Sequence, residues 1–410
     1  MDNKVYIVKC PDYEQAEEKL AELMAMMSGM GSFAKPGEKI ILKTNLLLPA
    51  KPEQGVTTHP AVVATIGKMA KDAGAVPIIA DSPGSGFKYN KKTMERIYRR
   101  CGVDKAAEEA GIELNLDTSY ETVSFPKGKL IKRFEVITPI LHSDAVFNLC
   151  KLKTHLFMHM TGAVKNNFGV IPGLTKPGYH AKLHDKNLFA NMLLDLAEYV
   201  SPRLSVMDAV LGLEGEGPGT SGEPRHVGLL IASESPLALD VVASEIIGLD
   251  RETNPVLAEA EKRDMHPNRI EDVQVEGCDI SELRIADYKF PGTVTGKLGN
   301  KNVPWWQKPM EPLFEYSKKA FGESDMMPWF HKAMSPMFRN AMALKPRVIT
   351  KNCIACGVCR DSCPMQVITI IDEKYAQINE DECIRCYCCH EMCQKDAIGL
   401  HKSLLYRMIN

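Results

Sequence analysis

The sequence lacks the features that mark membrane-spanning, secreted or nucleic-acid-binding proteins. No apolar run in its 410 residues approaches the roughly twenty residues that a membrane span needs. The start of the chain shows no signal peptide. The formal net charge is only −2, so the composition predicts no nucleic-acid partner. Together these absences predict a cytoplasmic protein in a reducing compartment, with any membrane contact peripheral.

Common nucleotide-binding motifs are also missing. The P-loop requires Gly-Lys-Ser or Gly-Lys-Thr, and neither string occurs. Gly84 and Gly86 form a Gly-x-Gly pair without the third glycine of a dinucleotide site, and we favour a plain turn here. No flavin motif is evident. The remaining composition, 45% hydrophobic and 25% charged, is typical of a globular protein with two or three domains.

Cysteine, in contrast, is concentrated near the C-terminus in two runs of equal spacing. In each run, three thiolates two residues apart can bind one iron–sulfur cube, while the fourth points away and completes the other cube. The spacing therefore predicts two 4Fe-4S clusters with crossed ligation. The first cluster would be bound by Cys353, Cys356, Cys359 and Cys393, and the second by Cys383, Cys386, Cys389 and Cys363.

Zinc sites and disulfides are the alternatives for these cysteines. Zinc sites usually join two Cys-x-x-Cys pairs across a longer gap and have no need of a third cysteine two residues further on. Disulfides are disfavoured in a reducing compartment. Residues 348–410 are too few to bury a large core, so bound clusters would supply much of the folding energy. Cys388 is either a substitute ligand or a buried thiol, and we favour the thiol.

The C-terminal sixty or so residues resemble two-cluster bacterial ferredoxins. The resemblance includes a pseudo-repeat, in which Val367-Ile368 after the first run matches Ala397-Ile398 after the second. One departure is Gln394, which follows Cys393 where such ferredoxins normally have proline. The resemblance implies a small α+β ferredoxin-like domain that transfers electrons.

Residues 1–287 show short apolar runs that alternate with helical stretches. This pattern is typical of an α/β domain with a mainly parallel sheet. In open α/β sheets, ligands bind beyond the carboxyl ends of the strands, so polar residues there indicate a site. The predicted strands span residues 5–8, 39–43, 76–80, 145–149, 204–208 and 227–232, and the first predicted helices span 13–28 and 60–73.

Polar and basic residues follow three of the predicted strands. The third leads into residues 151–186, which hold six lysines and four histidines against a single acid. Cations that face one cleft create a positive field, which concentrates an anion such as a phosphate or carboxylate. We predict that Lys43, Asn45, Asp81, Lys151 and Asn166 bind an anionic ligand, and that Lys153, His155 and Lys165 are the catalytic candidates.

Two further groups of residues suggest metal binding, each with a structural alternative. His155 and His159, like His180 and His184, are four residues apart and would share a helix face if that segment were helical. Surface or anion-binding histidines are the alternative. Asp208, Glu214 and Glu216 could hold a divalent cation beside the glycine-rich segment 214–223, which could equally be a lid, a ligand-binding loop or a surface turn. Asp240 and His59 are expected to be structural, His59 as a helix cap.

These elements together resemble proteins classed as domain of unknown function 362 with an appended ferredoxin domain. The resemblance rests on Asp208, Asp240, the glycine-rich segment and the strings Lys43-Thr44-Asn45, Asp81-Ser82-Pro83, Lys151-x-Lys153-x-His155 and Thr161-Gly162-x-Val164-Lys165-Asn166. It implies an iron–sulfur protein of anaerobic or low-potential metabolism, without an established reaction.

The segment 288–347 joins the two predicted domains and is basic and rich in proline, methionine and tryptophan. Helical spacing at 313–321 and 329–342 predicts short amphipathic helices between the domains, with an interfacial membrane contact as the alternative.

Three functions fit the sequence. We favour an oxidoreductase that takes electrons from a soluble protein and passes them to a small anionic substrate or cofactor. An electron carrier or maturation factor that docks a partner protein is the second. A non-redox enzyme with purely structural clusters is the third.

Overall fold

The computed structural model describes residues 3–292 and 344–401. The two helices predicted at 313–321 and 329–342 therefore lie outside the described residues. Within the described residues, no helix is both long enough and apolar enough to cross a bilayer.

Residues 3–292 form an α/β domain around a nine-stranded sheet. The strand order is β11-β1-β10-β9-β7-β2-β3-β4, with β8 paired to β7. Strand β10 runs antiparallel to both neighbours and β8 runs antiparallel to β7, whereas the other pairs are parallel. This mixed, mainly parallel sheet confirms the predicted α/β class. Its strands are β1 (Lys4–Lys9), β2 (Lys39–Lys43), β3 (Val76–Ala80), β4 (Glu113–Leu114), β7 (Ala145–His155), β8 (His159–Thr161), β9 (Leu204–Gly215), β10 (Gly222–Ser233) and β11 (Gln274–Gly277), and a separate hairpin comprises β5 (Tyr120–Ser124) and β6 (Arg133–Ile137).

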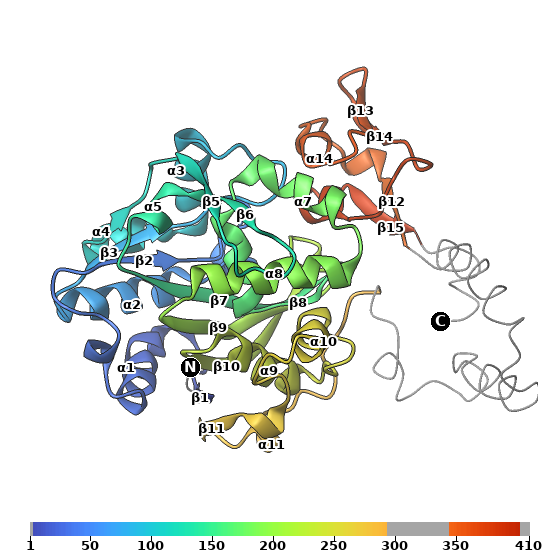
Figure 1. Ribbon diagram of the computed structural model, residues 1–410. Helices are drawn as coiled ribbons and strands as arrows, with labels where there is room; N and C mark the ends of the chain where they lie inside the picture. The colour runs from blue at the N-terminus through green and yellow to red at the C-terminus, as the bar shows by residue number, and fades with distance from the viewer. Residues whose placement is uncertain (1–2, 293–343, 402–410) are drawn as a thin grey trace, which may run out of the picture.

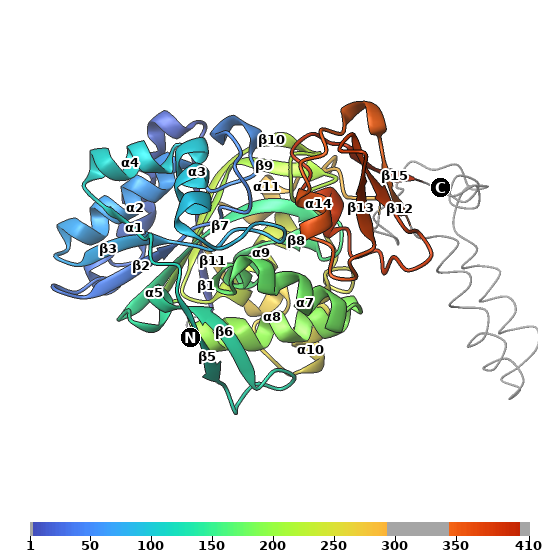
Figure 2. The same ribbon diagram turned by 90° about the horizontal axis from the view of Figure 1, so that it is seen from above.

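Helices cover both faces of the sheet, as Figures 1 and 2 show. Within β2, Ile40 and Leu42 pack into one hydrophobic core and Ile41 into the other, because alternate side chains point to opposite faces. The first core includes α1 (Ala16–Met26), α2 (Pro60–Asp72), α3 (Lys91–Cys101) and α4 (Val103–Ala110), and the second includes α8 (Lys186–Val200), α9 (Pro236–Ile247) and α10 (Pro255–Lys262). The short helices are α5 (Thr138–Leu141), α6 (Ala163–Asn166), α7 (Lys176–Lys182) and α11 (Ile280–Leu283).

Three strands, β7, β9 and β10, are much longer than predicted, which changes the setting of the site. Strand β7 was predicted to end at Leu149 but continues to His155, and all of its residues are buried. Strand β9 continues to Gly215, and β10 begins at Gly222. The glycine-rich segment is therefore the short turn of a long hairpin. The basic residues that follow Leu149 lie on a buried strand and not on an exposed loop.

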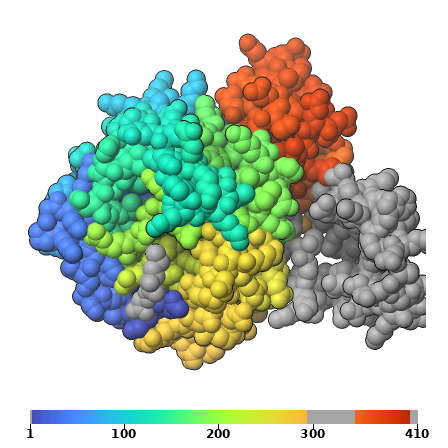
Figure 3. Space-filling view, in the orientation of Figure 1, coloured from blue at the N-terminus to red at the C-terminus, as the bar shows by residue number. Residues whose placement is uncertain are grey.

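Residues 344–401 form a small second unit, which we call the cysteine-rich unit. Its elements are β12 (Lys345–Val348), α14 (Val358–Asp361), β13 (Ile368–Ile371), β14 (Tyr375–Ile378), α15 (Cys388–Glu391) and β15 (Ile398–His401). Strand β12 pairs with β15 and β13 with β14, both antiparallel. Figure 3 shows this unit packed against the α/β domain. The two ends of the predicted connecting segment belong to different units. Its last residues lie in β12 of the cysteine-rich unit. Near its start, the Tyr288 hydroxyl donates to the carbonyl of Leu213 in the α/β domain at 3.0 Å.

Candidate functional site

The carboxyl ends of three adjacent parallel strands bring the predicted anion-binding residues together. Strands β2, β3 and β7 are neighbours, and Lys43 at the end of β2 pairs in register with Ala80 on one side and Asn148 on the other. Asp81 directly follows β3. Helix α6, which carries Lys165 and Asn166, returns against β7. The three polar strand ends meet at one edge, because neighbouring parallel strands end on the same side of the sheet.

Lys43 and Asp81 form a buried ion pair. The Lys43 Nζ lies 2.7 Å from Asp81 Oδ1, and both side chains are almost completely inaccessible. The Asp81 carboxylate also accepts hydrogen bonds from the backbone amides of Leu46 and Ser82. Gly169 permits this packing, because a Cβ there would lie 2.3 Å from both Asp81 Oδ1 and Lys43 Nζ. Each charge is thus neutralised by the other, and we infer that the ion pair holds the ends of β2 and β3 in place.

Lys151 belongs to a separate network, on the Asp208 side of β7. Its Nζ lies 2.8 Å from Asp208 Oδ2 and 3.0 Å from the Tyr13 hydroxyl. The backbone amide of His59 donates to the same carboxylate, and the imidazole of His59 accepts from Ala61, which caps α2 as expected. Lys151 was predicted to bind the ligand, but its charge is neutralised by Asp208 and it does not line the cavity described below.

Lys153 is held by neutral acceptors. Its Nζ donates to Asn45 Oδ1 at 2.8 Å and to the carbonyl of Val56 at 2.7 Å. The Asn45 amide donates in turn to Asn166 Oδ1 at 3.0 Å. Burial, together with the positive charges of Lys165 and Lys151, lowers the pKa of Lys153 well below its ordinary value. The neutral amine of Lys153 is therefore favoured, and its hydrogen bond orients Asn45.

Lys165 is the lysine of this group with no hydrogen-bonding partner among the described residues. Asp240 positions Lys165 by holding the start of α6. The Asp240 carboxylate accepts hydrogen bonds from the backbone amides of Ala163 and Val164 at 2.5 and 3.0 Å. This confirms the structural role expected of Asp240. Burial lowers the pKa of Lys165, and the nearby Glu391 carboxyl opposes that shift. Lys165 is therefore free to contact a ligand.

The histidine pairs do not share helix faces, so the condition set for joint metal binding is not met. His155 and His159 face each other across the β7–β8 hairpin, and His184 lies beyond the end of α7. The Nδ1 of His155 accepts the amides of Phe157 and Met158, whereas the Nδ1 of His159 donates to the carbonyl of Thr253. His180 is packed among aromatic rings. These separate roles leave no paired imidazole edge for a metal.

The predicted acidic cluster does not converge on a single point either. Asp208 is held by Lys151, Glu214 lies near Arg225 and Lys289, and Glu216 accepts the amide of Gly292. Extension of β9 spreads these acids along a strand, so the structure gives no support to a shared divalent cation.

A cavity of about 60 Å³ lies between the α/β domain and the cysteine-rich unit. Helix α15 of the cysteine-rich unit closes it with Glu391 and Met392, two residues for which the sequence gave no signal. The α/β domain supplies most of the polar wall. Its lining includes Lys43, Asn45, Asp81, Ser82, His155, Lys165, Asn166, Lys176 and His180.

The cavity lining carries more positive than negative charge. Three lysines, Lys43, Lys165 and Lys176, stand against two acids, Asp81 and Glu391. Lys176 contacts only neutral oxygens, among them Ser82 Oγ at 2.5 Å and the carbonyl of Pro83 at 2.6 Å. Burial lowers its pKa to about 7. The Asp81 carboxylate opposes this shift, and a bound anion would further stabilise the protonated lysine.

The glycine-rich hairpin turn docks the cysteine-rich unit. Thr220 donates to the carbonyl of Cys393 at 3.2 Å, and Ser221 donates to Asp396 at 2.8 Å. A Cβ at Gly219 would lie 2.2 Å from the carbonyl oxygen of Glu391. The close approach anticipated for this segment is therefore to the second unit of the same chain.

Changing Gly219 to alanine is expected to destabilise this interface. The added methyl group would overlap the backbone of α15, and overpacking of this kind costs about 1–3 kcal/mol. Anaerobic denaturant unfolding of the full chain measures the loss. Gly31→Ala is the matched control, because a Cβ there meets nothing within 4 Å. Equal stability of the two variants would contradict the docking role.

The structure brings cysteines of the two runs close together, while the crossed ligation of two clusters stays a prediction. Cys353, Cys356, Cys359 and Cys393 line one cavity of about 290 Å³. Burial raises the pKa of the Cys389 thiol, and the neighbouring thiols of Cys386, Cys383, Cys359 and Cys363 raise it further, so Cys389 lies near members of both predicted sets. Backbone amides donate to three of the sulfurs, those of Cys353, Cys383 and Cys393, at 3.2–3.4 Å.

All thirteen cysteines are free thiols, so the chain as described has no disulfides. Four soft donors around a common cavity, with amide hydrogen bonds to sulfur, are the donor set that an iron–sulfur cube requires. Among the described residues, no group of three His, Cys, Asp or Glu side chains lies close enough together to hold a single metal ion. Cys388 is fully buried, in keeping with a plain buried thiol.

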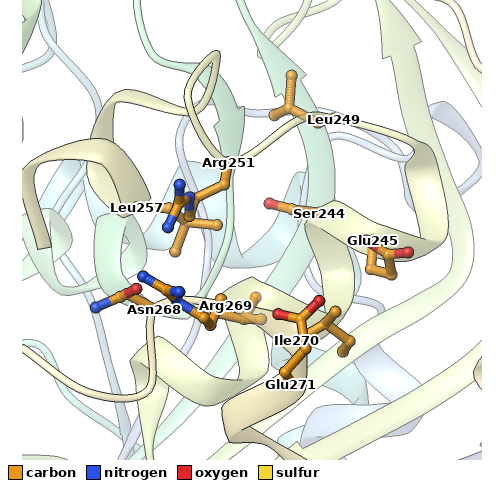
Figure 4. Close-up of a pocket in the computed structure, with 10 residues that line it drawn as sticks. Ser244, Glu245, Leu249, Arg251, Leu257, Asn268, Arg269, Ile270 and Glu271 are labelled. Carbon is orange, nitrogen blue, oxygen red and sulfur yellow. The ribbon is translucent and has the colours of Figure 1, made fainter. Parts of the chain in front are cut away.

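A third cavity, also of about 290 Å³, lies between α9 and residues 268–271 (Figure 4). Arg251 and Arg269 both contact Glu261, at 2.5 and 3.1 Å, so their charges are largely compensated. The cavity lies apart from the strand ends and the cysteines, and it has no comparable group of lysines. It is therefore the weaker candidate for an anion site.

Comparison with solved structures finds two partial likenesses. One is the lactate racemase apoprotein of Thermoanaerobacterium thermosaccharolyticum, with a TM-score of 0.39 and 13% identity over 60% of this chain and 57% of that chain. The other is a Thermotoga maritima protein, with a TM-score of 0.34 and 14% identity over 53% of this chain and 55% of that one. These scores are too low to support an argument.

Comparison of sequences is more informative. A thylakoid-associated protein of Synechocystis sp. is 33% identical over 300 residues, which cover 71% of this chain and 88% of that protein. An uncharacterized protein of Methanocaldococcus jannaschii is 44% identical over 48 residues, 12% of this chain and 18% of its own length. The family model described as Domain of unknown function (DUF362) matches residues 40–245, which contain the predicted anion-binding residues of the α/β domain. The chain therefore belongs to the DUF362 family.

Proposed function

We propose that this protein is an iron–sulfur oxidoreductase that reduces a small anionic substrate or cofactor bound between its two units. The two cysteine sets would hold a pair of 4Fe-4S clusters, which supply one-electron transfer when bound. A soluble electron-donor protein would be the redox partner. Because all of the cysteines are free thiols, a reducing, cytoplasmic setting suits the chain.

The observation that carries this proposal is the shared wall of the interface cavity. Helix α15 contains Cys389, a proposed cluster ligand, and it also places Glu391 against the lysines of the α/β domain. An anion held by those lysines would therefore lie beside the cluster-binding thiols. A structural staple has no need of a basic cavity next to its ligands, so this arrangement favours redox chemistry over purely structural clusters.

The chain's own residues suggest a division of roles at this cavity. Lys165 would bind the anion, because it lacks a partner in the described structure. The Nδ1 of His155 accepts two backbone amides, so in the neutral imidazole the hydrogen is on Nε2, and His155 can act as a hydrogen-bond donor. Lys153 would act indirectly by orienting Asn45. Lys43 and Asp81 would hold the strand ends in place.

A non-enzymatic electron carrier is the second candidate, favoured by the outer face of the cysteine-rich unit. Cys356 is exposed, and Ile354 and Met365 are 60% and 43% exposed. Apolar side chains beside an exposed thiol would suit transient docking of a partner protein. This face is also compatible with electron entry in the enzyme, so the two functions differ at the interface cavity.

Anaerobic voltammetry of the full-length protein, with and without inorganic phosphate, tests the proposal. We expect iron and sulfide in about equal amounts, reversible reduction, and a shift of one midpoint potential when phosphate binds near one cluster. Absence of iron and sulfide, or redox silence, would refute it. Clusters whose potentials do not respond to phosphate or other small anions would support the carrier function instead.

A further inference from the structure

We propose that a basic groove beside the cavity of the first predicted cluster docks an acidic electron-donor protein. The inference rests on the proposed function and deepens it, since it names the surface at which electrons enter and the charge of the partner. In each encounter, one electron would pass from the reduced centre of the donor to the oxidised first cluster. The donor is oxidised by one electron and the cluster is reduced by one, and no bond is formed or broken.

The groove lies where the α/β domain meets the cysteine-rich unit, and it has a volume of about 430 Å³. Three of its lining side chains are cationic, namely Arg96 and Arg100 of α3 and Lys395 of the cysteine-rich unit. The other four lining residues are uncharged, so no described acid lines the groove. Because the whole chain has a formal net charge of only −2, the groove is a local concentration of positive charge.

The positive charge of the groove is not compensated within the described structure. Arg96 lies over the ring of Phe87 at 5.6 Å, and none of the three cations forms an ion pair with a described acid. Arg96 and Arg100 are four residues apart on α3, and like charges at this spacing repel each other. The cysteine-rich unit adds Lys395 to the same groove instead of an acid. Arginine stays protonated in proteins, so carboxylates of a partner are what would relieve this repulsion.

The groove adjoins the cavity that holds the cysteines of the first predicted cluster. Arg96, Gln394 and Lys395 line both. The cluster cavity is also lined by Cys356, which is exposed, and by Ile354, which is 60% exposed. An exposed apolar residue with charged residues beside it has the composition of a protein interface, in which apolar contacts are surrounded by a polar rim. A partner whose carboxylates contact the arginines would thus lie next to the first cluster.

The exposure of the groove favours a protein over a small molecule. Small-molecule sites enclose most of the surface of their ligand. Here Arg96, Arg100, Gln394 and Lys395 are exposed, and the remaining lining residues are partly exposed. Exposed charges of this kind raise the rate of association more than the final affinity. That property suits an electron donor, which must bind and then leave.

Stopped-flow reduction of the full-length, cluster-loaded protein by a reduced acidic flavodoxin tests the proposal. We expect the second-order rate constant to fall at least about tenfold between about 0.01 M and 1 M salt, because the Debye length shortens from about 30 to 3 Å. Binding of the oxidised flavodoxin, measured by calorimetry at low salt, reports docking separately from electron transfer. Pyrophosphate is titrated in parallel as the small anionic probe.

Two charge reversals on the same helix separate the groove from general electrostatics. Arg100→Glu should lower the rate constant about tenfold at low salt, and the difference from the wild type should vanish at high salt. Arg99→Glu is the matched control, because Arg99 is also exposed on α3 but does not line the groove. This substitution makes the same change in net charge and should lower the rate constant less than about twofold. Iron content and thermal unfolding verify that both variants are loaded and folded.

A rate constant that is insensitive to salt, or that both substitutions lower equally, would overturn the inference. Tight pyrophosphate binding that Arg100→Glu abolishes, with an unchanged flavodoxin rate, would assign the groove to a small phosphorylated ligand and would also overturn it. Failure of the proposed function looks different. Missing iron and sulfide would refute the redox role, while flavodoxin binding that depends on Arg100 would still support the docking surface. Redox-active clusters that both variants reduce equally fast would refute only the groove.

Discussion

Replacing Cys393 with serine is expected to remove about half of the bound iron, and the iron lost should belong to the cluster of the first cysteine run. Cys393 comes last in sequence, yet it lines the same cavity as Cys353, Cys356 and Cys359. A serine there would leave that cube with three thiolates. The loss should also destabilise the cysteine-rich unit, because its own core is small and its two halves would lose one of their cross-links.

Iron and sulfide analysis, together with electron paramagnetic resonance of the reduced protein, measures this effect. Cys356→Ser should remove the same signal as Cys393→Ser, whereas Cys383→Ser should remove the other. Cys388→Ser is the matched control, because this buried cysteine adjoins Cys389 and has no assigned ligand role. If Cys393→Ser removed the same signal as Cys383→Ser, ligation would not be crossed.

The second large effect is expected from Lys165→Ala, which should weaken phosphate binding by about ten- to a hundredfold. The estimate follows from a hydrogen bond to a charged group, worth about 1.5–3 kcal/mol. Lys165 has no partner in the described structure, so its removal leaves no acceptor unpaired and should not unfold the chain. Binding calorimetry gives the affinity, and cluster absorbance should stay unchanged.

Lys182→Ala is the matched control for this variant. Lys182 belongs to the same basic stretch of the sequence but is exposed on α7, so its removal should alter phosphate affinity by less than about twofold, as expected for a solvent-screened charge. Equal effects of the two substitutions would indicate attraction by general positive charge. Full retention of binding by Lys165→Ala would contradict the assigned site.

Local sequence patterns predicted much of the α/β domain correctly. Strands β2 and β3 match their predicted bounds residue for residue, because each is a short apolar run whose side chains pack on both faces of the sheet. The meeting of Lys43 and Asp81 was not predictable, because the sequence did not show that β2 and β3 are neighbours. The lengths of β7, β9 and β10 could not be read from the sequence either. Polar residues continue β7 to His155, because ion pairs and neighbouring strands satisfy them in the folded state.

The role of each polar residue depended on partners distant in sequence. Lys151 and Lys153 look alike in the sequence, yet Asp208 neutralises one and Asn45 orients the other. Glu391 offered no signal at all, because its importance arises only where α15 meets the lysines of the other unit. By itself, the sequence determined the α/β class, the spacing of the cysteines and the basic stretch, all of which are local in the chain. Only the tertiary structure decided which charges are paired, which lysine is free and which acid closes the cavity, because burial and electrostatic pairing depend on distances between segments that the sequence does not contain.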